Sequence, residues 1–105
     1  NPEVIGTTAS STGSLALSRT KLKESLAAYQ AGRKDEAESL ALSAYLDGFE
    51  PLEPGLAARD PSLLKAIERA MAHVRAAIGD SLPVAEVESR ISALMCMEVG
   101  LVRFW

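Results

Sequence analysis

Three carboxylates lie within seven residues near the middle of this 105-residue chain: Asp47, Glu50 and Glu53. Two prolines, Pro51 and Pro54, interrupt the chain at the same place. Hard cations such as iron are held by several oxygen ligands, which one short segment of chain can supply. We therefore predict a metal site at Asp47, Glu50 and Glu53. The alternative is an acidic corner that only keeps the chain soluble.

Other residues offer little chemistry. The single histidine, His73, lies off the apolar stripe of its expected helix, so we expect a surface side chain. Met95, Cys96 and Met97 fan out around a helix and cannot all reach one ion; we interpret them as packing residues, with Cys96 a small apolar filler. The sequence has no nucleophile–base set, glycine-rich phosphate loop or paired-histidine motif. We predict no catalytic residue, no cofactor-binding residue and no enzymatic activity.

The charge pattern narrows the class of ligand. Residues 33–60 carry seven acids against three bases, in a chain whose net charge is −3. Nucleic acid requires a basic face that engages its phosphates, so we expect no nucleic-acid partner, whereas a cation suits this acidic middle. One cysteine excludes an internal disulfide. The sequence contains no run of eighteen apolar residues, so we predict no membrane span. Because no methionine opens the chain, we interpret it as a processed or excised piece.

The spacing of the apolar residues predicts four helices. Alanine and leucine, which favour helices, dominate the composition. Apolar residues recur at helical spacing in residues 15–31, 33–45, 61–78 and 83–94, and each segment has one apolar stripe. The stripes are Leu15, Leu22, Leu26 and Tyr29; Ala37, Leu40, Ala41, Ala44 and Tyr45; Leu64, Ile67, Met71, Val74 and Ile78; and Val84, Val87, Ile91 and Leu94.

Residues that favour helix ends separate these segments. Gly32 is expected to end the first helix and Gly79 the third. Asp60 and Pro61 predict the start of the third helix, because an acidic N-cap and a proline at the first helical position both favour a helix start. Residues 48–55, between the second and third helices, are expected to form a structured corner.

These elements predict an all-α fold. Four helices with short connections and one apolar stripe each are typical of an antiparallel four-helix up-down bundle. We assign residues 15–105 to this single domain, and residues 1–14, which are rich in Ser, Thr and Gly, to a flexible lead-in. The first two helices also resemble a tetratricopeptide hairpin, but no repeat of about 34 residues follows, so we prefer the bundle.

Glu98 occupies the next position on the apolar stripe of the last helix. A buried carboxylate must be paired, bound to a ligand or neutral. The alternative is that the bundle ends before Glu98, whose side chain is then solvated. The apolar tail that follows is a candidate interface patch. It contains Leu101, Val102, Phe104 and Trp105.

A run of residues also carries a family resemblance. These residues are Ala28-Tyr29-x-x-Gly32, then Ala37-x-x-x-Ala41-x-x-Ala44-Tyr45-Leu46-Asp47-Gly48-Phe49-Glu50-Pro51-Leu52-Glu53, and more loosely Leu64, Ile67-Glu68, Val74-Arg75 and Ile78-Gly79. Over residues 15–95 the chain thereby resembles the extracytoplasmic N-terminal domain of bacterial Ftr-type (high-affinity iron/lead) permeases. The Arg-Glu-x-x-Glu motifs of such permeases lie in their membrane helices and are absent here, since Phe49 precedes Glu50. The metal site is therefore inferred from the carboxylates themselves.

The resemblance implies an all-helical periplasmic domain that precedes a membrane permease in the same full-length chain, at the periplasmic face of the bacterial inner membrane. We therefore expect a domain that captures Fe²⁺ or Fe³⁺ at the acidic corner and hands it on to the pore. The alternative is a protein-interaction or oligomerisation module, which docks a periplasmic iron-binding protein or forms a homo-oligomer.

Overall fold

The computed structural model describes the backbone of residues 2–101 and the side chains of residues 13–101. Within this part of the chain no strand occurs, so the fold is all-α. A π-helix, η1, and a 3₁₀-helix, η2, connect the second α-helix to the third. The elements are α1 (Pro2–Gln30), α2 (Lys34–Ser43), η1 (Ala44–Phe49), η2 (Glu50–Leu52), α3 (Glu53–Arg59), α4 (Pro61–Gly79) and α5 (Val84–Val99).

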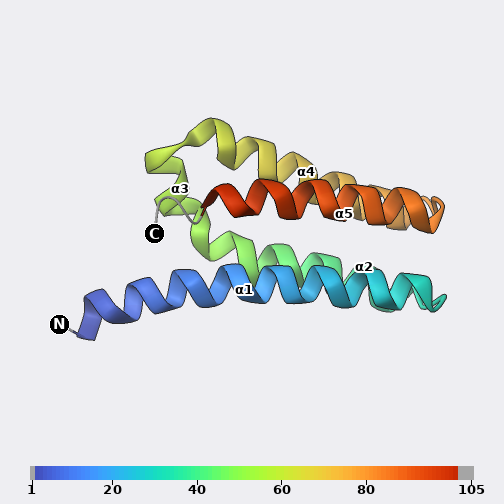
Figure 1. Cartoon of the computed structure of the whole chain (residues 1–105), viewed down its shortest axis with the longest axis horizontal. Coiled ribbons are helices and arrows are strands. Elements are labelled where there is room, and N and C mark those ends of the chain that lie inside the picture. Colours follow the sequence, from blue (N-terminus) through green and yellow to red (C-terminus); the bar gives the residue numbers. More distant parts are fainter. Residues whose placement is uncertain (1, 102–105) are drawn as a thin grey trace.

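Helices α1, α2, α4 and α5 surround the interior. Helix α1 packs on α2 and α5, and α4 also packs on α2 and α5. Figure 1 shows the pairs α1–α2 and α4–α5 as two layers, with the turn of each pair at the same end of the molecule. The connection through η1, η2 and α3 lies at the opposite end and joins the layers (Figure 1). The acidic corner therefore lies at one end of the fold.

Local sequence signals explain most of the helix ends. Gly32, two residues after the end of α1, has a left-handed backbone (φ 80°), a conformation that glycine adopts without a steric penalty. The Asp60 side chain accepts a hydrogen bond from the backbone N–H of Leu63 at 3.0 Å, which confirms the predicted N-cap. Helix α4 ends at Gly79 as expected, but the left-handed residue that follows is Ser81 (φ 55°).

Two segments differ from the sequence-based expectations. Helix α1 begins at Pro2, so the backbone of residues 2–14 continues that helix; the flexibility of residues 1–14 stays a prediction. The corner contains η1, η2 and the additional helix α3, which the periodicity did not reveal. Pro51 and Pro54 each fall in the first turn of a new helical element, where a missing N–H costs little.

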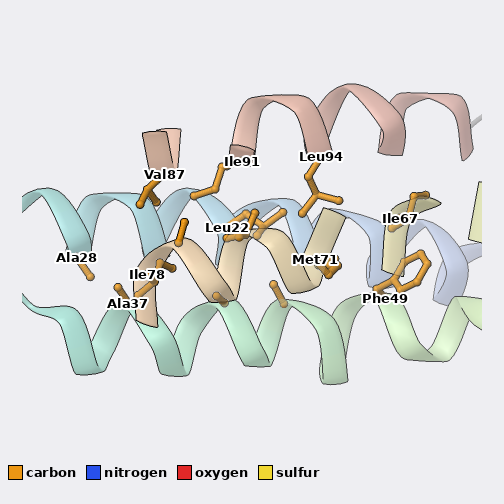
Figure 2. Packing of buried hydrophobic residues seen from close by; sticks show 14 of the residues in the cluster. Leu22, Ala28, Ala37, Phe49, Ile67, Met71, Ile78, Val87, Ile91 and Leu94 are labelled. Atoms are coloured by element: carbon orange, nitrogen blue, oxygen red, sulfur yellow. The ribbon is translucent and has the colours of Figure 1, made fainter. Parts of the chain in front are cut away.

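The predicted apolar stripes meet in the core, except that Val84 of the last stripe is 40% exposed. Leu22 of α1, Phe49 of η1, Met71 of α4 and Leu94 of α5 are buried members of one apolar cluster, part of which is drawn in Figure 2. Burial of each such side chain contributes about 1.5–3 kcal/mol to the free energy of unfolding. The fully buried residues of α2 are both small, which lets its backbone approach its neighbours closely, and the half-buried Leu40 packs against the core. The two fully buried residues are Ala37 and Ala41.

Candidate functional site

A change of helix type builds the acidic corner, which is the segment that contains Asp47, Glu50 and Glu53. Pro51 and Pro54 have no backbone N–H, so the α-helical hydrogen bonds to the carbonyls of Asp47 and Glu50 cannot form. The chain stays helical by widening to η1 and then tightening to η2 before α3 begins. Side chains in this segment therefore do not follow one α-helical register.

Gly48 sets the distance between η1 and α1. It is buried, and a Cβ atom at this position would lie 2.6 Å from both the Cα and the Cβ of Ser18. Nonbonded carbon atoms normally lie about 3.5–4.0 Å apart, so a larger residue here would force the two backbones apart. Glycine therefore allows the corner to pack directly on α1.

The three predicted metal ligands lie on successive elements of the corner. Asp47 is exposed, and its Oδ2 accepts a hydrogen bond from Ser43 Oγ at 2.7 Å. Glu50 is exposed on η2, and Glu53 is half-buried at the start of α3. Among the described residues, no three or more His, Cys, Asp or Glu side chains gather in a way that could hold a metal ion. A metal site at Asp47, Glu50 and Glu53 stays a prediction.

Instead, Glu53 pairs with a carboxyl group from another helix. The side chain of Glu53 lies within hydrogen-bonding reach of Glu68 on α4, and two carboxyl groups can share such a bond only when one of them is protonated, since ionised carboxylates only accept. This hydrogen bond, then burial and the charges of Glu68 and Glu50, raise the pKa of Glu53 to about 7. Glu53 therefore keeps its proton to a higher pH than an ordinary glutamate does.

Sequence reasoning did not assign Glu68 to the site. The residue follows the buried Ile67 and lies four positions after Leu64 and three before Met71, so it borders the apolar stripe of its helix. An acid that borders the apolar stripe of a helix is the sequence signal that could have indicated Glu68. Its pairing with Glu53 depends on how α3 packs against α4, which periodicity does not reveal.

A tyrosine and an arginine lie beside the carboxyl pair. The guanidinium carbon of Arg75 lies 5.2 Å from the centre of the Tyr45 ring, a favourable cation–π geometry. Burial, followed by the charges of Glu53, Glu68 and Glu50, raises the pKa of the Tyr45 phenol, while Arg75 partly offsets this rise. Arg75 Nη1 is buried and has no hydrogen-bond partner within the described part of the chain. The corner thus combines several negative groups with one cation.

A second carboxyl group lies between α1 and α5. Glu98 is 0% exposed, and its Oε2 accepts a hydrogen bond from Ser18 Oγ at 2.8 Å. Its Oε1 has no partner among the described residues. Burial raises the pKa of Glu98 to about 7, although the Ser18 hydrogen bond and the Arg19 charge oppose that rise. The solvated alternative for Glu98 is therefore wrong, because the packed interior continues to the buried Leu101.

Two of the three consecutive residues Met95, Cys96 and Met97 are less buried than expected. Cys96 is exposed and Met97 is 36% exposed, so their interpretation as packing residues is wrong. Met95 alone of the three packs against the core. Consecutive helical residues point about 100° apart, so three in a row cannot all face one interior. His73 is exposed, which confirms the prediction made for it.

The apolar tail falls largely outside the described residues. Leu101 is fully buried, so it is unavailable as part of a surface patch. Val102, Phe104 and Trp105 lie beyond the part of the chain that the structure describes. An interface formed by the tail stays a prediction.

Membrane insertion and known relatives give no further assignment. In the described part of the chain, no helix combines the length and the apolar character that crossing a membrane requires. The chain matches no protein-family model, no curated protein and no solved structure.

Proposed function

We propose that this chain is the extracytoplasmic module of a metal-ion permease, at the periplasmic face of the bacterial inner membrane, and that it captures a cation and hands it on. The observation that carries the proposal is the Glu53–Glu68 carboxyl pair, which lies inside the segment with the permease resemblance. We take the four long helices as an antiparallel up-down bundle that presents this pair at one end.

The chemistry of the pair suits a hard cation. Carboxylate oxygens and water are the ligands that Fe²⁺, Mn²⁺ and similar ions accept. Glu53 and Glu68 contribute oxygens from two helices, and Glu50 adds negative charge beside them. Asp47, exposed one turn earlier, strengthens the field that attracts the ion. Two carboxylates with water give modest affinity, which allows the ion to be released to the pore.

Proton release accompanies capture in this proposal. A metal ion requires ionised carboxylates, so it must displace the proton that Glu53 keeps up to about pH 7. Cation binding therefore strengthens as the pH rises through about 7 and weakens below it. This pH dependence distinguishes the pair from a set of ordinary surface acids, which are already ionised in that range.

Isothermal titration calorimetry tests the proposal. Fe²⁺ (without oxygen) and Mn²⁺ are titrated one pH unit below and one above the Glu53 pKa of about 7. We expect saturable binding that is stronger at the higher pH and is abolished in Glu53→Gln/Glu68→Gln. Repeating the titration in two buffers of different ionisation enthalpy measures the released proton. A second variant, Asp47→Asn/Glu50→Gln, measures the contribution of the other predicted ligands.

The matched control removes two acids elsewhere. Asp35→Asn/Glu88→Gln changes the same charge on exposed positions of α2 and α5, so binding should be nearly unchanged. Binding that survives in Glu53→Gln/Glu68→Gln would move the site elsewhere. No binding to the wild-type chain would favour the second candidate function.

That second candidate is a protein-interaction or oligomerisation module. It is favoured by a groove on the outer side of α4 and α5 whose rim is basic, although the chain as a whole is acidic. An interaction module should show no carboxylate-dependent response to cations, so the same titration separates the two functions.

A further inference from the structure

A groove of about 370 Å³ lies between α4 and α5. Its floor contains Ala66, Ala70 and Ala93, whose small side chains leave the groove hollow. Met97 also lines it and is 36% exposed, although it is one of the larger apolar side chains. An apolar side chain of a partner can therefore enter this groove and remove its apolar lining from water.

Two arginines line the groove. Arg69 and Arg90 lie there together with His73 and the alanines. Arg90 is held in place, because its Nη1 donates to the His73 carbonyl at 2.9 Å and its Nε donates to Glu86 Oε1 at 3.0 Å. Arg69 is exposed and forms no ion pair with any other described residue. The groove therefore suits a partner with apolar residues flanked by acids.

The same chain presents such a surface on α2 and η1. Leu42 and Leu46 lie four residues apart and are each 44% exposed. Asp35, on the face of α2 that leads to Leu42, and Asp47, beside Leu46, are also exposed. This surface is open to solvent, as is the groove, so neither covers the other within one copy. Their charges and apolar content are complementary.

We propose that the α2–η1 surface of one copy docks in the α4–α5 groove of a second copy. Leu42 and Leu46 enter the groove, and the flanking aspartates pair with the arginines of its rim. Two different surfaces meet, so the contact is heterologous and each added copy presents a new groove. The inference concerns self-association and does not rest on cation capture, which uses Glu53 and Glu68.

Analytical ultracentrifugation of the whole chain over a range of concentrations, without metal, tests the proposal. We expect the weight-average mass to rise with concentration from the 11.1 kDa of one copy to at least twice that value. Ionic pairs at an exposed rim are screened by salt, so high salt should shift this rise to higher concentration. A chain that stays monomeric up to millimolar concentration would overturn the proposal and leave the groove to another protein.

Two variants with one damaged surface each provide the decisive comparison. Leu42→Ser/Leu46→Ser removes the docking leucines, and Arg69→Glu/Ala93→Glu places acids on the groove. Each variant should be monomeric alone, because it retains only one of the two surfaces. Mixed in equal amounts, they should form a dimer of one copy of each, since an intact groove then meets an intact docking surface.

Controls exclude trivial outcomes. Leu17→Ser/Val84→Ser removes two comparably exposed apolar residues outside both surfaces and should associate like the wild-type chain. Circular dichroism verifies that every variant is folded. Association that persists in either single-surface variant, or a mixture that stays monomeric, would contradict docking of these two surfaces.

Discussion

Glu53 and Glu98 have pKa values raised to the same level, about 7, in opposite surroundings. Glu53 is half-buried at the corner, and the main cause of its shift is the hydrogen bond with Glu68. Glu98 is fully buried, and the main cause is burial itself. Both effects disfavour the ionised form. Glu53 is the more accessible of the two, so under the proposed function only its proton can be exchanged for a cation from solvent.

The two regions are nevertheless connected through α1. Ser18 donates its hydrogen bond to Glu98 and also lies against Gly48, the residue through which η1 approaches α1. The π-helix η1 then leads into the segment that carries Glu53. The buried region therefore helps to position the corner.

The largest effect is expected from Glu98→Gln. In the unfolded chain Glu98 ionises near the ordinary glutamate pKa of 4.5, whereas in the folded chain its pKa is about 7. Stability from this residue is thus fully present below pH 4.5 and is lost as the pH rises to 7, at about 1.4 kcal/mol per pH unit. Above pH 7, Glu98→Gln should be more stable than the wild-type chain by about 3 kcal/mol.

Chemical denaturation over the pH range measures this difference. Below pH 4.5 the two proteins should have similar free energies of unfolding, because protonated Glu and Gln are close in shape and both uncharged. The control is Glu88→Gln, an exposed position on the same helix, which should follow the wild-type pH dependence. An equal pH dependence in Glu98→Gln and the wild-type chain would show that Glu98 is not buried as described.

Gly48→Ala should destabilise the fold by about 2 kcal/mol, since overpacking typically costs about 1–3 kcal/mol. The added Cβ would meet the Ser18 backbone at 2.6–2.7 Å, and backbone cannot move aside like a flexible side chain. Gly13→Ala is the control, because it has no atom within 4 Å of the new Cβ. Thermal unfolding compares the two variants. A stability of Gly48→Ala equal to that of Gly13→Ala would argue against the close approach of η1 and α1.

Glu68→Gln should return the pKa of Glu53 from about 7 toward the ordinary glutamate value of 4.5. The glutamine amide can donate a hydrogen bond to ionised Glu53, which favours the charged form. Carboxyl-carbon NMR titration measures this pKa, and the pKa of Glu98 serves as the internal control because it should stay near 7. An unchanged Glu53 pKa would mean that Glu68 is not its partner.

The smallest effect is expected from Glu50→Gln. The charge of Glu50 is the weakest of the causes that raise the pKa of Glu53, so its removal should lower that pKa by less than Glu68→Gln does. The same NMR titration measures the change, and added salt should reduce the difference between Glu50→Gln and the wild-type chain. A larger fall than in Glu68→Gln would reverse the assigned roles of the two residues.

The helices and most of the core were determined by the sequence, because both depend on local patterns. Residues such as Ile67, Met71 and Val87 are buried as their 3.6-residue spacing predicted. Gly32 and Asp60 act at helix ends through the backbone of their immediate neighbours. Such signals extend over a few residues and can be read without knowledge of the rest of the chain.

Only the tertiary structure decided which acids have special chemistry. Ser18 and Glu98 are 80 residues apart in the chain, and Glu53 and Glu68 belong to different helices. Asp47, Glu50 and Glu53 lie on a π-helix, a 3₁₀-helix and an α-helix in turn, so their sequence spacing alone does not set their relative positions. Burial and carboxyl pairing depend on the packing of whole helices, which no short pattern in the sequence specifies.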